Sequence, residues 1–301
     1  MATIKTITAI INGQSVTLNY NDANHKYEAT VVAPANTSYN NNDGHYFPVT
    51  IKATDTAGNV TTIDEHDSKF GASLKLRVKE TVKPTIEITS IGANATITNN
   101  SPTIEFNVVD SGAGVNKASV VLKVNGSPVQ LTEPVPISNG FKYTYKASGL
   151  KDGVNSISVD CKDFDDNVAE TANRSFTVDT VPPTLNITAP ANAFITNKAS
   201  CNVVGTTNDV TSSPVTVKIV VNDVDAGAVS VGGNGAFTKA VTLREGSNTI
   251  QITATDRAGK STTVTRTVEL DTKAPVFTSV TVTPNPVNTS ASYVISVEVN
   301  S

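Results

Sequence analysis

The stretch Ala53-Thr54-Asp55-Thr56-Ala57-Gly58-Asn59 follows an alternating strand, and close variants of it occur twice more in the chain. The variants are Cys161–Asn167 and Ala254–Lys260, after the alternating runs Ile157–Asp160 and Ile250–Thr253. The aspartates of the three copies lie 108 and 93 residues apart (163 − 55 and 256 − 163). A period near 100 residues is that of a small domain rather than of a solenoid repeat. The sequence therefore predicts a row of similar β-rich modules.

A second repeated phrase marks the joints between these modules. It reads Glu80–Pro84, Asp179–Pro183 and Asp271–Pro275, and its final prolines lie 99 and 92 residues apart. A third phrase, Asn94–Asn99, returns 98 residues later as Asn192–Asn197. Proline fixes φ and cannot donate to a ladder, which suits a short, stiff crossing. These joints predict an elongated, semi-rigid rod of modules.

The strand and turn pattern predicts an all-β chain of tandem immunoglobulin-like β-sandwiches. In the module at 84–181 we expect strands at about 84–90, 102–110, 118–125, 128–132, 141–147, 154–163 and 169–178. Asn125-Gly126 has the composition of a type I′ hairpin turn. Seven short strands with such turns are typical of an immunoglobulin-like sandwich. The module at 182–273 repeats the pattern.

The two ends of the chain depart from this repeat. The module at 1–83 opens on the hairpin of Thr8–Gly13, so the two strands that precede this hairpin in the later modules are missing. The tail at 274–301 contains two strand-like runs, Val276–Thr283 and Ser292–Val299, which resemble the first two strands of a module. An incomplete sandwich has an open edge, which strand addition from elsewhere can close.

We expect this tail to complete the first module of a neighbouring copy, or to pair with a different protein. The alternatives are that the tail packs locally on the third module or is a cut end. The edge around Ile7–Ile11 is the expected acceptor. The interface candidates from this strand accounting are Ile7, Ile10, Ile11, Tyr293, Val294, Ile295, Val297 and Val299.

Composition argues against several classes of function. The formal net charge is −4 with no basic run, so we expect no nucleic-acid binding. The longest apolar runs have the length of strands, and no membrane span is expected. Cys161 and Cys201 fall in different modules, so neither module has an internal disulfide. The three histidines fit no zinc spacing and no nucleophile or phosphate motif is present, so we expect no enzyme.

Repeated carboxylates are the one chemical signal of the chain. Asp55, Asp163 and Asp256 recur after the same strand, while Asp179 and Asp271, with Glu80, recur at the joints. Calcium takes six to eight oxygen ligands, so a joint carboxylate and a turn aspartate together would suit it. The other interpretation is a plain β-turn, in which Asp accepts backbone N–H groups and Gly58 or Gly259 takes a positive φ. Under that interpretation the chain has no cofactor.

One loop is a candidate for carbohydrate contact. Two tyrosines flank an Asn-rich stretch at Tyr39–Tyr46, and aromatic rings beside polar groups can stack on sugars. Most loops of this composition are only loops, and the chain has no Trp to strengthen the case.

The phrases Ala-Thr-Asp-x-Ala-Gly-Asn and Val178–Thr188 resemble those of tandem bacterial Ig-like domains, which occur in bacterial adhesins and in phage structural proteins. Lys260 and Asp166 depart from that pattern. An opening Met without an export signal, and the lack of a sorting motif, favour resemblance to phage tail or baseplate-associated proteins.

The resemblance implies a structural or decorating virion protein, assembled in the host cytoplasm, with other virion subunits, copies of itself or a host-surface glycan or protein as partners. The alternatives are the stalk of an adhesin on the bacterial cell surface and an accessory array of carbohydrate-binding modules.

Overall fold

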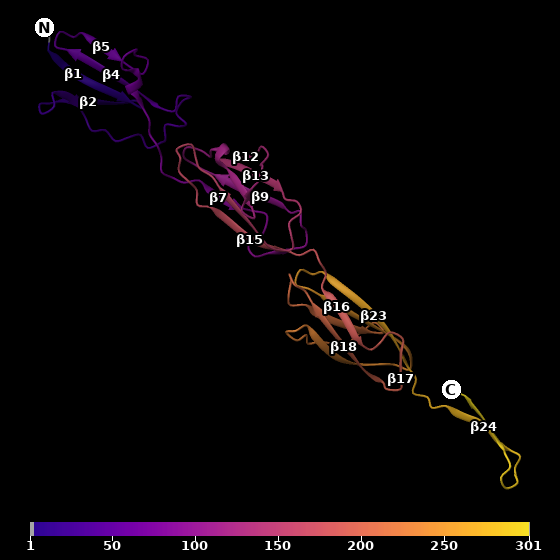
Figure 1. The fold of residues 1–301 in the computed structure, drawn as a ribbon. Helices are drawn as coiled ribbons and strands as arrows, with labels where there is room; N and C mark the ends of the chain where they lie inside the picture. Colours follow the sequence, from indigo (N-terminus) through magenta and orange to yellow (C-terminus); the bar gives the residue numbers. More distant parts are fainter. Residues whose placement is uncertain (1–2, 301) are drawn as a thin grey trace. The chain divides into compact units, whose positions relative to one another are not determined.

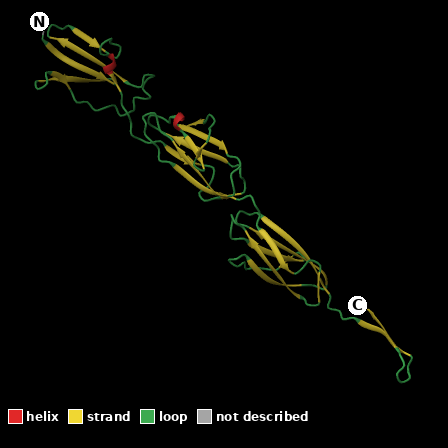
Figure 2. Ribbon diagram, viewed as in Figure 1, coloured by secondary structure: helices red, strands yellow, loops and turns green. Residues whose placement is uncertain are grey.

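The computed structural model describes residues 3–300, and strands dominate it. Its only helical elements within that range are two short 3-10 turns, Gly71–Leu74 and Lys117–Ser119 (Figure 2). The chain forms two compact units. The first comprises residues up to Ala95 together with Ser101–Phe176, and the second comprises Thr96–Asn100 together with residues from Thr177 onward. No helix among the described residues is long and apolar enough to cross a membrane.

The module at 84–181 is a sandwich of two sheets. One sheet has the order β12-β13-β9-β7 and the other β11-β10-β14-β15-β8. The strands are β7 (Thr85–Ile88), β8 (Thr96–Ile97), β9 (Thr103–Val109), β10 (Val121–Val124), β11 (Ser127–Pro128), β12 (Val135–Ile137), β13 (Gly140–Lys146), β14 (Gly153–Asp160) and β15 (Ala172–Val178). Ile104, Phe106 and Val108 of β9 are 0% exposed. Inward side chains of Leu122 and Val159 from the other sheet are equally buried, so both sheets share one core.

The module at 182–273 repeats this plan with sheets β16-β18-β21 and β17-β23-β22-β19-β20. Its strands are β16 (Thr184–Ala189), β17 (Phe194–Thr196), β18 (Ser200–Asn208), β19 (Thr216–Val221), β20 (Val224–Asp225), β21 (Ala236–Thr242), β22 (Gly246–Thr255) and β23 (Ser261–Leu270). Its core joins residues of both sheets, including Val203, Ile219 and Ile252. The tandem immunoglobulin-like fold expected from the sequence is confirmed.

The predicted turns have the expected backbone. Asn125 and Gly126 have φ of 50° and 79°, as a type I′ turn requires. Asn12-Gly13 in the first module repeats this geometry. Asp166, which stands where the other two copies have Gly, takes a φ of 72° itself. Cys161 and Cys201 are free and buried, in agreement with the expectation of no disulfide.

The module at 1–83 consists of a single sheet with the order β3-β2-β1-β4-β5, and β6 also pairs with β4. The strands are β1 (Ile4–Ile11), β2 (Gln14–Asn21), β3 (Lys26–Glu28), β4 (Phe47–Asp55), β5 (Val60–Ile63) and β6 (Lys75–Leu76). The prediction that β1 offers an open edge is wrong. β1 is a central strand, because β2 pairs with one of its sides and β4 with the other.

The tail forms a separate two-stranded sheet of β24 (Val276–Thr283) and β25 (Val294–Asn300), as Figure 1 shows at the yellow end of the chain. The two strands are antiparallel, and Val276 pairs with Asn300. Most of their side chains are exposed on both faces of the hairpin.

Candidate metal centres

Three carboxylates converge at one end of the second module. Glu80 lies on the segment that enters the module, Asp110 follows β9, and Asp163 lies in the turn after β14. Each residue offers an oxygen, and these three oxygens lie within 4.8 Å of one another. Asp163 is fully buried and Asp110 nearly so. We call this group the second-module triad.

The third module builds the same group from equivalent residues. Asp179 follows β15, Asp209 follows β18, and Asp256 lies in the turn after β22. Their oxygens also lie within 4.8 Å of one another, and all three residues are buried. The equivalent pairs lie 99, 99 and 93 residues apart (179 − 80, 209 − 110 and 256 − 163). We call this group the third-module triad.

Backbone N–H groups hold one oxygen of each aspartate in these triads. Asp110 Oδ1 accepts from the N–H groups of Gly112 and Gly114, at 3.0 and 2.7 Å. Asp209 Oδ1 accepts in the same way from Thr211 and Ser212, at 2.8 and 2.6 Å. The carboxylates are therefore fixed in place by the turns that carry them.

The turn aspartates are held in the manner that the turn interpretation predicts. Asp163 Oδ1 and Asp256 Oδ1 accept the N–H of Asn167 and Lys260, at 2.8 and 2.9 Å. Asp55 in the first module makes the same bond to Asn59, and Gly58 and Gly259 both have a positive φ. The turn geometry expected at these aspartates is thus present, and in the later two modules the same aspartates also enter the triads.

Several second oxygens of the triads are buried without a partner. Asp110 Oδ2, Asp179 Oδ2 and Asp256 Oδ2 have no hydrogen-bond partner and almost no contact with solvent. None of the ion pairs among residues 3–300 involves any of the six triad carboxylates. Buried carboxylates this close repel one another unless a proton or a cation lies between them.

The two triads differ at one neighbouring residue. The Nδ2 group of Asn167 donates to Asp163 Oδ2 at 2.7 Å and to Glu80 Oε1 at 3.2 Å, so it partly satisfies the second-module triad. In the third module Lys260 replaces this Asn, and two oxygens, Asp179 Oδ2 and Asp256 Oδ2, stay unpartnered.

Burial raises the pKa of the Glu80 carboxyl, and a hydrogen bond shared with Asp163 raises it further.

The remaining predicted metal candidates lie outside these groups. Asp55 is held by the backbone and side chain of Asn59, which lower its pKa, and no group of three possible metal ligands within residues 3–300 includes it. Asp271 is exposed, and its Oδ1 accepts the N–H of Lys273. Asp110 and Asp209 were missed from the sequence, although their 99-residue spacing was a usable signal.

The predicted carbohydrate loop has no free aromatic face at Tyr39. His45 stacks against its ring at 4.0 Å, and Phe164 stacks against it at 4.3 Å. Tyr46 lies beneath the ammonium group of Lys75. The Tyr39–Tyr46 loop is therefore built as a packed structure, which speaks against the expected sugar contact there.

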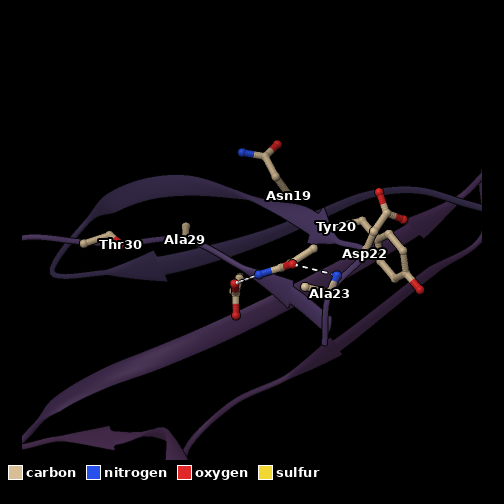
Figure 3. A pocket seen from close by; sticks show the side chains of 8 residues that line it. Asn19, Tyr20, Asp22, Ala23, Ala29 and Thr30 are labelled. Atoms are coloured by element: carbon tan, nitrogen blue, oxygen red, sulfur yellow. Dashed lines mark hydrogen bonds between the residues drawn. The ribbon is translucent and has the colours of Figure 1, made fainter. Parts of the chain in front are cut away.

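A shallow concavity lies beside the β2–β3 hairpin instead (Figure 3). Figure 3 shows Tyr20 and Asp22 on one side of it and Ala29 and Thr30 on the other. The side-chain amide of Asn21 donates to the Glu28 carboxylate through Nδ2 and accepts the N–H of Ala23 through Oδ1. The Tyr20 ring is about half exposed and tilts against Tyr27 at 5.1 Å, so this site offers an aromatic ring beside amide groups.

Comparison with known proteins finds one matching family model and several solved structures of low similarity. Residues 183–272 match the family model described as glucodextranase, domain B. No curated protein matches the chain. Fibronectin(III)-like modules of Clostridium thermocellum CbhA are 17% identical with a TM-score of 0.37, covering 62% of this chain and 94% of theirs.

Two further solved structures have similar scores. Sidekick-1 immunoglobulin domains 1–5 are 14% identical with a TM-score of 0.41, covering 99% of this chain and 60% of theirs. A fragment of a 1.5-MDa bacterial ice-binding adhesin is 22% identical with a TM-score of 0.34, covering 90% and 88%. Such identities carry no functional conclusion. The chain is thus similar to tandem modules of the immunoglobulin and fibronectin type III kind.

Proposed function

We propose that this chain is a non-catalytic display or spacer protein whose second and third modules each bind a calcium ion at the point where the preceding linker enters. The observation that carries the proposal is the pair of equivalent triads with buried, unpartnered carboxylate oxygens. Oxygen-only ligands of high negative charge suit calcium rather than zinc or copper. A bound ion would tie the linker carboxylate, Glu80 or Asp179, to the module that follows it.

Calcium titration of the full chain tests this proposal. After chelator treatment, calorimetry is expected to detect two calcium sites per chain, and the third-module site is expected to bind more tightly because more of its oxygens lack partners. At a calcium concentration about 100 times Kd, binding would stabilise a module by about 2.7 kcal/mol. Absence of binding heat, together with equal melting temperatures in calcium and in chelator, would contradict the proposal.

We propose that the chain acts as a structural or decorating component of a phage virion. The support is the resemblance of the repeated phrases to Ig-like phage proteins. Neighbouring tail, portal and lysis genes, and antibody labelling of purified particles, are the expected results. Neighbouring sortase or export genes, with labelling of the bacterial surface, would instead support an adhesin stalk.

A glycan contact is a second candidate function, favoured by the half-exposed Tyr20 ring beside Asn19 and Asn21. A glycan array tests it with the full chain and a Tyr20→Ala variant. Binding that the variant loses would support the contact. An array without any signal would reject it, and would leave the calcium proposal unaffected.

A further inference from the structure

One face of the first-module sheet has the residue pattern of a sandwich interior, and no second sheet lies over it in the described part of the chain. On this face Ala9 pairs with Val16 of β2 and with Ile51 of β4. Ile7 and Ile11 flank Ala9 on the same face, whereas Ile10 points to the opposite face. The residues equivalent to Ala9 and Ile51 in the second module, Leu122 and Val159, are 0% exposed. Here Ala9 is also buried, with 6% exposed, but Ile51, Ile7 and Ile11 are only half-buried.

One segment of the same module has no strand partner among residues 3–300. Residues 29–34 belong to no strand, and Val32 is 91% exposed. In chain order the segment occupies the place of β13 and β21, which lie between the hairpin and the strand before the repeated turn. Those strands pair with β9 and β18, the second strands of their modules. Among the described residues of the first module no such second strand exists, so the backbone of 29–34 stays available.

The tail hairpin begins in the register of the missing strand pair, and a bulge between Phe277 and Ser279 follows its first two pairs. In the second module Thr85 pairs with Val109, in the third Thr184 pairs with Asn208, and in the tail Val276 pairs with Asn300. Each pair is separated by 24 residues (109 − 85, 208 − 184 and 300 − 276). Each pair also begins directly after a joint proline. The tail therefore has the strand order of the first hairpin of a module, and no second sheet faces it among the described residues.

The apolar row of β25 corresponds to a buried row. By this register Ile295, Val297 and Val299 are equivalent to Ile104, Phe106 and Val108 of β9. The β9 residues are completely buried, whereas Ile295 is 59% exposed and the other two about half exposed. An isolated two-stranded hairpin is only marginally stable in water. Both halves of this sandwich therefore gain by burying each other.

We propose that β24–β25 of one copy completes the first module of a second copy. β25 adds as a strand beside residues 29–33, and its apolar row covers the face of Ile7, Ala9 and Ile11. The occupant is a second copy because the tail has the hairpin register that modules two and three use for their own completion. The two contacting surfaces differ, so the contact repeats from copy to copy and gives rings or open filaments.

The second module fixes the register of this addition. Phe106 of β9 lies opposite Tyr143 of β13, and their rings stack at 5.1 Å. Asn139 and His25, both with positive φ, precede β13 and the 26–33 stretch at equivalent positions. Tyr143 is thus equivalent to Ala29. Val297 of one copy is therefore expected to lie opposite Ala29 of the next.

A disulfide between two differently tagged full chains tests the proposal. One chain carries Ala29→Cys and the other Val297→Cys, and the control replaces Val297→Cys with Ser296→Cys, which lies on the opposite face of β25. The native thiols interfere little, because Cys161 and Cys201 are buried and burial raises the pKa of Cys161 to about 12.

The expected result is a disulfide-linked pair of the two tagged chains, formed in several-fold higher yield than in the control. Light scattering of the unmodified chain should give a mass at least twice 31.4 kDa that falls on dilution. Equal yields in test and control, or a monomeric mass at every concentration, would overturn the proposal. A chain carrying both Ala29→Cys and Val297→Cys that links only internally would also overturn it, since its own tail would then be the occupant.

Discussion

Asp179 and Asp256 lie 77 residues apart in sequence, yet each offers an oxygen within 4.8 Å of the other. One follows the last strand of the second module and the other follows β22 of the third. Both have a buried Oδ2 atom without a hydrogen-bond partner. Two buried carboxylates this close repel each other when both are ionised, so a cation between them would stabilise the module.

Replacing Asp256 with Asn should therefore have opposite effects with and without calcium. Asp256→Asn keeps the Oδ1 acceptor for the Lys260 N–H but removes one buried charge. In chelator we expect the third module to gain stability, because removing one of two adjacent buried carboxylates relieves the repulsion between them. In calcium the variant should lose most of the stabilisation seen in the unmodified chain. Thermal unfolding in both conditions measures this.

Asp55→Asn is the matched control, because Asp55 makes the same turn bond without belonging to a triad. Its response to calcium should equal that of the unmodified chain. A loss of calcium response in Asp55→Asn would assign the effect to the turn rather than to the triad.

The pH dependence of the free energy of unfolding of the second module should reflect the raised pKa of Glu80. Because the folded-state pKa of Glu80 is raised, its proton stabilises the calcium-free fold below the ordinary value of 4.5, and this contribution is lost as the pH rises through the raised pKa. Glu80→Gln should remove that contribution. As the pH rises above 4.5, the free energy of unfolding in chelator should therefore fall less steeply for Glu80→Gln than for the unmodified chain. Parallel curves would contradict the assignment.

Equivalent core truncations should have unequal costs in the first and third modules. Ile252 is fully buried, so Ile252→Ala should destabilise the third module by about 2–5 kcal/mol. Ile51 occupies the equivalent position on the uncovered face, and Ile51→Ala should cost clearly less in a monomeric sample. Chemical denaturation at low protein concentration compares the two. Equal costs would mean that the first module has a covered core on its own.

The buried side chain of Asn248 should contribute strongly to the stability of the third module. At the entry to β22, Asn248 donates to the carbonyls of Arg244 and Gly246 and accepts from the Arg244 N–H. It also accepts from the side chain of Asn222, which lies in the turn between β19 and β20. Asn248→Ala would leave these buried groups unpaired, at a cost of about 1–3 kcal/mol. The exposed Asn202→Ala serves as control, with almost no change expected in the unfolding midpoint.

The turns of the fold could be predicted from the sequence because each depends on a short local pattern of residues. Asn125-Gly126 and the turn at Asp163 each combine strand alternation with residues that tolerate a positive φ. β8 and β17 were not expected, because strands of two and three residues that pair in parallel with a distant strand leave no periodic signal. The central position of β1 was missed for a related reason, since β4 reaches it from about 40 residues away.

The triads were only half predictable. Asp163 and Asp256 belong to a repeated phrase, whereas Asp110 and Asp209 follow strands with different flanking residues, Ser111-Gly112 in one module and Val210-Thr211 in the other. Their closeness to the linker carboxylates results from the way three separate segments meet at one end of a sandwich. Such a meeting is a property of the tertiary structure, which the local pattern does not encode.

The unpaired tail hairpin and the uncovered first module give any chain of copies a direction. One terminus of such an assembly always presents a vacant acceptor face, and the other always presents a spare hairpin. Growth rates at the two termini would then be independent of each other. A single capping protein that binds only one of these surfaces would stop elongation there while leaving the opposite terminus free.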